Sequence, residues 1–258
     1  MAAPMVRNCA AKFVGNFGVY YNSFRQLCMS LSNLNHPPGH LWSTEFWDSF
    51  YERKLKSKET SFDWFLTFES LQGHILPILN GPTSLPPIRV LDIGCGTSDF
   101  ALKLYRSSSP PVHQITCIDI SEVAINQMSS MHRQLKPRDT KSPGVCYNTG
   151  DIKNLDFDSD TFDMILDKGT TDAIIRSPRG TEIFGGIFKE CTRLLKDDRT
   201  WVQVSDAPPE DRLDLLERSK MSSSEYKDPL LLISYKDLGV HFGVEYFMYL
   251  IYKRGKVI

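Results

Sequence analysis

The sequence predicts an α/β fold built on a doubly wound, mostly parallel sheet of seven strands. Beyond Pro87, apolar runs of strand length alternate with segments of helical periodicity, which is typical of a parallel sheet covered on both faces. The first of these runs, residues 88–93, leads directly into a glycine-rich turn. The last two runs have no helical segment between them, so we expect an antiparallel hairpin at the C-terminal edge of the sheet.

The hydrophobic pattern assigns each element in order. Two amphipathic helices, residues 44–58 and 67–79, precede the sheet, with an aromatic cluster at residues 62–65 between them. Strands are expected at residues 88–93, 112–118, 144–148, 162–166, 201–205, 230–234 and 244–252, and the intervening helices at residues 98–105, 121–135 and 181–195.

The composition is that of one globular domain of catalytic size. The chain has 258 residues, of which 41% are hydrophobic and 24% charged, and its formal net charge is -1. Composition therefore gives no support for nucleic acid or an anionic membrane as a partner. No run approaches the roughly 18 to 20 apolar residues of a membrane-spanning helix. The six cysteines lack CxxC spacing and the histidines lack metal-binding spacing, so we expect neither a metal site nor a disulfide framework.

The first 44 residues differ in charge from the rest of the chain. They contain three basic residues, Arg7, Lys12 and Arg25, and the first acidic residue is Glu45. A basic, acid-poor segment is typical of a mitochondrial transit peptide, with a disordered N-terminus as the alternative. We therefore expect a transit peptide and linker over residues 1–43, a folded domain over residues 44–258, and a location in the mitochondrial matrix.

The turn after the first strand indicates a cofactor. In VLDIGCGTSDF, Asp92 closes the strand, and Gly94 and Gly96 leave room for a ligand beside the backbone. The dinucleotide fingerprint would place a third glycine where Asp99 stands. Asp92 can accept hydrogen bonds around the cationic methionine end of S-adenosylmethionine. The motif therefore favours a Rossmann-like class I methyltransferase over a dinucleotide-binding enzyme.

Two further strand ends carry residues suited to an adenosyl group. Asp119 lies 23 residues beyond Gly96, where a carboxylate accepts hydrogen bonds from two ribose hydroxyls, and Ile120 is expected to pack on the adenine. After the third strand, Asp151 is expected to accept from the adenine amino group, and the amide of Ile152 to donate to a ring nitrogen. Helix capping is the alternative role for each of these acids taken singly.

The fourth strand is expected to face the transferable methyl group. Methyl transfer to an amine is an in-line displacement, so the amine must be held close to the methyl carbon. Asp167, which follows this strand, is the predicted catalytic residue that orients the substrate amine, with hydrogen bonding to loop backbone as its alternative role. Lys168 is expected to form a salt bridge. Trp64 is expected to place an aromatic face toward the cationic sulfonium, with core packing as the alternative.

Six segments together carry a resemblance to a known family. They are Phe62–Phe65, LDIGCGTSDF at residues 91–100, IDIS at 118–121, LDKGTTDAI at 166–174, VSDAPPEDRL at 204–213 and YFMYLIYK at 246–253. The chain from about Phe62 to its end resembles lysine methyltransferases with a DKGT-type fourth motif, and within them the mitochondrial enzymes that act on citrate synthase. Thr171 departs from that pattern, which has a large apolar residue after DKGT.

The resemblance implies S-adenosylmethionine as methyl donor and a lysine of citrate synthase as acceptor. Related enzymes methylate a translation elongation factor, and the shared motifs do not separate the two substrates. A third possibility is a catalytically silent fold that binds S-adenosylmethionine and assists assembly of a mitochondrial complex. Small-molecule methylation is disfavoured, because the segments at residues 107–111 and 177–180 are too short to form a lid.

Overall fold

The computed structural model describes residues 41–59, 61–81, 87–109, 112–133, 144–222 and 231–255. The predicted transit peptide lies almost wholly outside these ranges, so its prediction is not tested by the fold. Within them, no helix is both long and apolar enough to cross a membrane.

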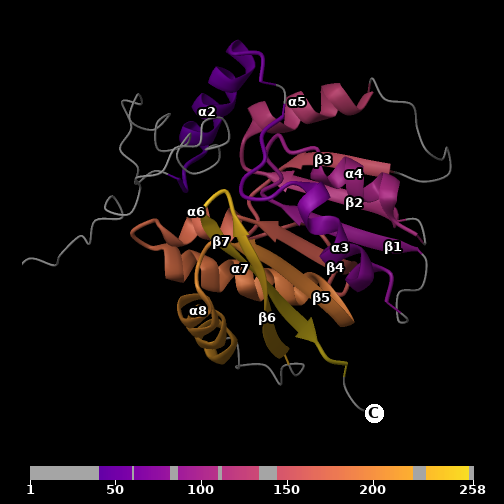
Figure 1. Ribbon diagram of the computed structural model, residues 1–258, viewed down its shortest axis with the longest axis vertical. Helices are drawn as coiled ribbons and strands as arrows, with labels where there is room; N and C mark the ends of the chain where they lie inside the picture. Colours follow the sequence, from indigo (N-terminus) through magenta and orange to yellow (C-terminus); the bar gives the residue numbers. More distant parts are fainter. Residues whose placement is uncertain are drawn as a thin grey trace, which may run out of the picture.

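One seven-stranded sheet forms the centre of the domain, in the order β3-β2-β1-β4-β5-β7-β6 (Figure 1). Its strands are β1 (Ile88–Ile93), β2 (Val112–Asp119), β3 (Gly144–Thr149), β4 (Phe162–Lys168), β5 (Leu195–Ser205), β6 (Leu231–His241) and β7 (Val244–Lys253). The first five strands pair in parallel, and β7 pairs antiparallel with both β5 and β6. The predicted doubly wound sheet with its C-terminal antiparallel hairpin is confirmed.

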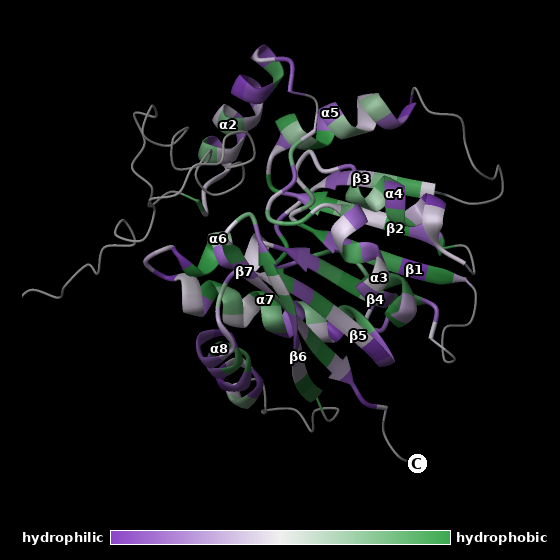
Figure 2. Ribbon diagram, in the orientation of Figure 1, coloured by the Kyte–Doolittle hydropathy of each residue, from purple (hydrophilic) through white to green (hydrophobic). Residues whose placement is uncertain are grey.

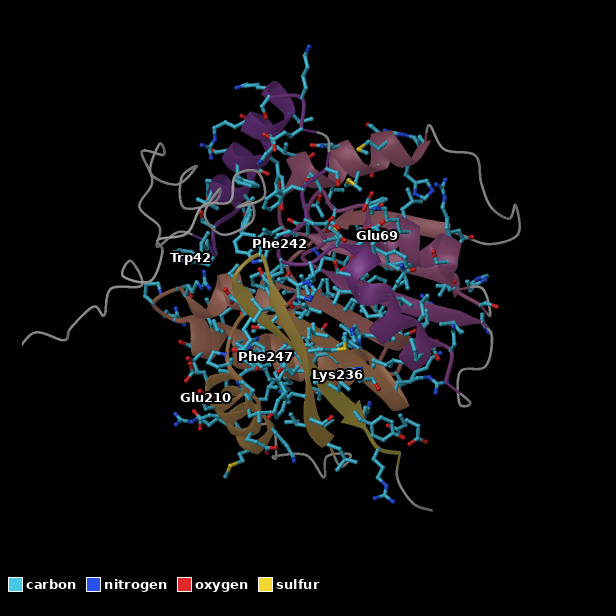
Figure 3. All side chains as sticks on the ribbon, viewed as in Figure 1. Trp42, Glu69, Glu210, Lys236, Phe242 and Phe247 are labelled. Carbon is cyan, nitrogen blue, oxygen red and sulfur yellow. The ribbon has the colours of Figure 1, made fainter. Side chains whose placement is uncertain are left out.

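Helices cover both faces of this sheet. They are α2 (Thr44–Lys56), α3 (Phe68–Leu79), α4 (Phe100–Ser107), α5 (Glu122–Arg133), α6 (Thr170–Ile175), α7 (Gly180–Leu194) and α8 (Pro209–Ser222). Apolar residues of α3, α4 and α5 pack on one face in one core, and those of α7 and α8 pack on the other face in a second core. Figure 2 shows the contrast between the apolar strands and the largely hydrophilic α8, and Figure 3 shows side chains filling the space between sheet and helices.

Two helices were absent from the sequence prediction. α8 begins at Pro209 with Glu210 and Asp211 in its first turn, and both proline and acidic residues favour that position because the first backbone amides of a helix have no partner within it. α6 has only six residues, which is too few for a hydrophobic period to be recognised.

Several boundaries also differ from the prediction. β4 continues to Lys168, so Asp167 and Lys168 belong to the strand rather than to the loop after it. α4 begins at Phe100 instead of Ser98, because the Ser98 hydroxyl accepts a hydrogen bond from the Phe100 amide and forms a turn there. β5 begins six residues earlier than predicted, at Leu195. These shifts leave the order and type of the predicted elements unchanged.

Candidate functional site

A cavity of about 470 Å³ lies at the carboxyl edge of the parallel strands, which is within the size range of small-molecule sites. All the residues predicted from strand ends and motifs line it: Asp92, Gly94, Gly96, Asp119, Ile120, Asp151, Ile152, Asp167 and Trp64. They come together because the carboxyl ends of neighbouring parallel strands meet at one edge of the sheet. Their individual roles toward a cofactor remain predictions.

The glycine turn after β1 is constrained by its neighbours as well as by its backbone. Gly94 and Gly96 have φ angles of +65° and +53°, a region that side chains disfavour. A Cβ atom on Gly94 would collide with the Thr170 side chain, and one on Gly96 with the hydroxyl of Tyr51. Sequence reasoning ascribed these glycines to ligand approach alone, whereas α2 and α6 also pack directly against the turn.

Asp119 fixes this turn from the end of β2. One carboxylate oxygen accepts a hydrogen bond from the Gly96 amide at 2.8 Å, and the other accepts from the Ser121 amide at 2.9 Å. Burial raises the pKa of Asp119, and the bonds from Ser121 and Gly96 oppose that rise. A carboxylate has about four acceptor positions, so both oxygens retain the capacity to accept from ribose hydroxyls.

Asp92 supplies a buried carboxyl group to the wall of the cavity. Burial raises its pKa to about 7, the charge of Lys168 opposes the rise, and the charges of Asp119 and Asp167 add to it. Because several carboxyl groups share this small volume, the site favours a cationic ligand, whose positive charge would stabilise Asp92 in its ionised form.

Asp167 at the end of β4 is held by hydrogen bonds from four groups. One carboxylate oxygen accepts from the amides of Thr170 and Thr171, each at 3.1 Å. The other accepts from the Gln203 amide group at 3.0 Å and from the Thr171 hydroxyl. Burial raises the pKa of Asp167 to about 6, against the effect of the Thr171 hydrogen bond. The carboxylate therefore caps α6 while it lines the cavity.

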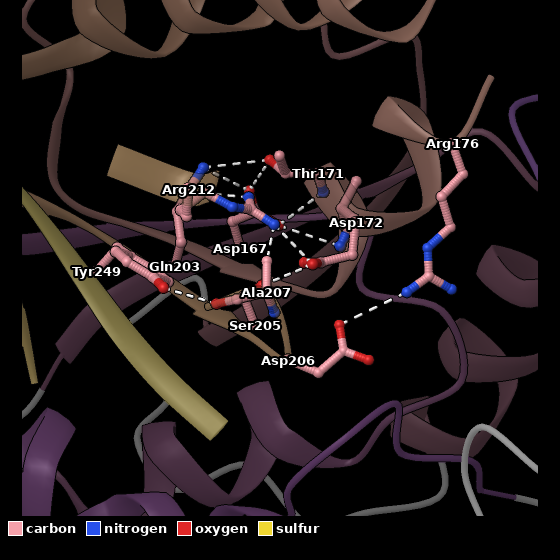
Figure 4. Close-up of polar contacts among 11 residues, drawn as sticks. Asp167, Thr171, Asp172, Arg176, Gln203, Ser205, Asp206, Ala207, Arg212 and Tyr249 are labelled. Carbon is pink, nitrogen blue, oxygen red and sulfur yellow. Dashed lines mark hydrogen bonds and ion pairs between the residues drawn. The ribbon is translucent and has the colours of Figure 1, made fainter. Parts of the chain in front are cut away.

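A buried arginine connects α8 to this network (Figure 4). The Arg212 guanidinium donates to Asp172 at 2.6 Å, to the Ser205 hydroxyl at 2.9 Å, and to the side-chain oxygen of Gln203 at 3.3 Å. With its oxygen turned toward Arg212, the Gln203 amide points its nitrogen at Asp167. Sequence reasoning gave Arg212 no role, and it lies in a stretch of acidic and basic residues that is typical of an exposed helix.

Aromatic residues from α2 and the following loop cover the cavity. The rings of Trp47 and Trp64 lie 5.7 Å apart, and Trp64 packs edge-on to Phe62 at 6.3 Å. The predicted salt bridge of Lys168 is with Asp63, at 3.1 Å, and the same ammonium donates to the Trp64 carbonyl at 2.8 Å. The cover is therefore attached directly to the end of β4.

A second attachment of this cover comes from α2. Asp48 accepts a hydrogen bond from the Ser121 hydroxyl at 2.6 Å, which joins α2 to the start of α5. Sequence reasoning assigned no role to Asp48 or to Tyr51, since both residues lie in an ordinary amphipathic helix and their partners are distant in sequence. No group of three or more His, Cys, Asp and Glu side chains in the described ranges could hold a metal ion.

The seven-stranded fold and the carboxylate-lined cavity at its edge define a class I methyltransferase. A family model described as "Methyltransferase domain" matches residues 86–241. The chain is 33% identical over 216 residues to the mitochondrial citrate synthase-lysine N-methyltransferase of Danio rerio, covering 81% of this chain and 83% of that protein. Its identity to the Homo sapiens counterpart is also 33%, with 80% and 84% covered. The chain belongs to this methyltransferase family, as an S-adenosylmethionine-dependent enzyme similar to those two proteins.

Two further comparisons are more distant. EEF1A lysine methyltransferase 4 of Mus musculus is 27% identical over 66% of this chain and 63% of its own length. Among solved structures, the geranyl diphosphate C-methyltransferase of Streptomyces coelicolor, in complex with S-adenosyl-L-homocysteine, superposes with a TM-score of 0.51 at 13% identity, covering 72% of this chain and 79% of that one. At that identity the likeness concerns the fold alone.

Replacing Arg212 by methionine is expected to destabilise the protein strongly. The change leaves Asp172 buried without its cation, and removing one partner of a buried ion pair costs about 3 to 5 kcal/mol. Urea denaturation followed by circular dichroism measures the free energy of unfolding. Arg218→Met is the matched control on the same helix, because Arg218 is exposed and forms its ion pair with exposed Asp214, and its effect should stay below about 0.5 kcal/mol. Equal effects of the two substitutions would contradict this account of the network.

Affinity for S-adenosylmethionine is expected to depend on pH through Asp92. With a pKa of about 7 in the free protein, Asp92 is protonated as the pH falls, and the cationic ligand then loses its negative partner. The affinity should fall about tenfold between pH 8 and pH 6, as measured by calorimetry. Asp92→Asn removes the titration, so its weaker affinity should be nearly constant over this range. A wild-type affinity independent of pH would exclude Asp92 from the cationic end of the ligand.

Proposed function

We propose that this protein transfers methyl groups from S-adenosylmethionine to a lysine side chain of citrate synthase in the mitochondrial matrix. The observation that carries the proposal is its 33% identity, over four-fifths of the chain, to proteins named for that activity. The acceptor-rich cavity supports the same chemistry, because both the methyl donor and a lysine side chain are cationic. The basic, acid-poor segment before Glu45 supports the location.

The cavity residues fit the parts of S-adenosylmethionine, which supplies an electrophilic methyl group on a positively charged sulfur. Asp92 holds the cationic methionine end, and Asp119 accepts from the ribose hydroxyls. Asp151 and Ile152 bind the adenine edge, with Ile120 packed on its face. The Trp64 indole N–H is buried beside the cavity and has no partner within the described residues, which leaves a donor for a bound ligand.

The acceptor lysine must lose a proton before it attacks the methyl carbon. Its ordinary pKa is near 10.4, so the site has to favour the neutral amine. The aromatic cover lines the cavity, and desolvation of an amine beneath it would lower the pKa of that amine. Asp167 has a raised pKa of about 6 and is therefore a stronger proton acceptor than an ordinary carboxylate. The amides of Thr170 and Thr171, the Gln203 amide group and the Thr171 hydroxyl already occupy its acceptor positions, so we assign it the orientation of the amine at the end of β4 through its negative charge.

A translation elongation factor is the second candidate substrate. The specific observation in its favour is the 27% identity to EEF1A lysine methyltransferase 4. That alignment covers less of the chain, and at lower identity, than the alignments with the citrate synthase-lysine N-methyltransferases. The elongation factor therefore ranks second as a candidate substrate. Nucleic acid and membrane remain unexpected as partners, in agreement with the nearly neutral net charge.

The proposal is tested by incubating the full chain with labelled S-adenosylmethionine and either citrate synthase or the elongation factor. We expect label on a lysine of citrate synthase and loss of that label with Asp92→Ala. Asp214→Ala, a substitution on the exposed side of α8, serves as the matched control and should retain full activity. Label on the elongation factor alone would reverse the ranking of substrates, and cofactor binding without transfer to any protein would favour the silent assembly factor.

Asp119→Asn is expected to weaken the binding of S-adenosylmethionine by about 1 to 3 kcal/mol, because the ribose hydroxyls lose charge-assisted hydrogen bonds. The shape of the side chain is kept, and its oxygen still accepts from one of the two backbone amides. Calorimetry gives the affinity, and the melting temperature checks the fold. If the affinity is unchanged, Asp119 does not bind the ribose.

A further inference from the structure

The two-residue turn between β6 and β7 contains Phe242, a residue type that the backbone conformation of the turn disfavours. His241 pairs with Val244, so the turn consists of Phe242 and Gly243 alone, with φ angles of +54° and +79°. Two successive positive φ angles define a type I′ turn, whose first position is favoured for asparagine, aspartate or glycine. A bulky residue is rare in this region because its Cβ atom crowds the backbone.

At Phe242, burial of the side chain does not offset the free-energy cost of the positive φ angle. Phe65 also has a positive φ, at 67°, but its ring is only 5% exposed and packs against Tyr246 at 5.3 Å. Burial of the Phe65 ring therefore offsets its backbone cost. The Phe242 side chain is 63% exposed, and its neighbour Val240 is 69% exposed. Phe242 thus combines a disfavoured backbone with an apolar ring in solvent.

The turn lies at the same edge of the sheet as the cavity. β7 runs antiparallel to β5, and Phe247 pairs with Ser205, the last residue of β5, so the start of β7 and the turn before it extend beyond the carboxyl edge. Figure 1 shows the turn at one end of the β6–β7 hairpin, and Figure 3 labels Phe242 there.

Packed rings join the turn to the cavity wall. Trp64, which lines the cavity, packs against Phe65 at 5.8 Å. Phe65 contacts Tyr246, and Tyr246 contacts His241 at 6.3 Å, next to Phe242 in sequence. Because each contact is between side chains of the described fold, the position of the turn relative to the cavity is fixed.

We propose that Phe242 is a docking residue for the folded protein substrate, inserting its ring into an apolar depression beside the target lysine. This inference rests on the proposed protein-lysine methylation. The turn is two to three strands from β4, roughly 10 to 15 Å across the sheet. A protein interface of about 800 Å² per partner reaches about 16 Å from its centre. A folded substrate centred on the cavity covers the turn, whereas a short peptide reaches the cavity alone.

The test is Phe242→Asn, which creates the Asn-Gly pair preferred by this turn. Its melting temperature should equal or exceed that of the unmodified chain, so a loss of function cannot come from misfolding. The KM for folded citrate synthase should rise about five- to thirtyfold, as for an interface anchor. We expect the affinity for S-adenosylmethionine, the kcat, and the kcat/KM for a ten-residue peptide around the methylated lysine to stay unchanged.

Leu232→Asn is the matched control. Leu232 is 47% exposed on the same hairpin but pairs with Tyr252 at the opposite end, so its substitution should leave every kinetic constant unchanged. An unaltered KM in Phe242→Asn, or an equal loss with peptide and folded protein, would overturn the docking role while leaving the methylation intact. Absence of transfer by the unmodified chain would refute the proposed function and the docking role with it.

Discussion

The burial of three carboxyl groups at one edge of a parallel sheet is the constraint on which the site depends. Asp92, Asp119 and Asp167 are each less than 10% exposed, and burial raises the pKa of all three. Burying such groups costs free energy unless each finds a partner. Asp119 accepts hydrogen bonds from two backbone amides. Asp167 accepts hydrogen bonds from the first turn of α6 and from the Gln203 side chain. The charge of Lys168 opposes the rise in the pKa of Asp92.

Helices and loops outside the sheet are positioned by contacts with the residues around these carboxyl groups. α8 contributes Arg212, which orients Gln203 and neutralises Asp172. α2 contributes Tyr51 against the glycine turn and Asp48 at the start of α5. The loop after α2 contributes Asp63, which pairs with Lys168. These contacts join outer elements to strand ends or to the helices that directly follow them, so the chemistry and the packing of the domain share the same residues.

Sequence alone identified the site residues at strand ends because the carboxyl ends of neighbouring parallel strands always lie at the same edge of the sheet. Once β1, β2 and β4 are recognised as parallel strands, Asp92, Asp119 and Asp167 must meet at one edge, whatever the loops do. Arg212 and Tyr51 escaped prediction because their importance depends on partners far along the chain, and a single sequence does not reveal such pairs. The start of α8 did carry a local signal, proline followed by two acids, but its hydrophobic period is weak.

With Phe242 as the proposed docking residue, the β6–β7 hairpin separates the choice of substrate from the chemistry in evolutionary terms. Among the described strands, β6 has β7 as its single neighbour in the sheet, and Phe242 contributes nothing to either core. Substitutions in the turn therefore leave the buried carboxylates and their partners undisturbed. After gene duplication, one copy could acquire a different protein target by changing a few exposed residues there, while the methyl-transfer machinery is inherited intact.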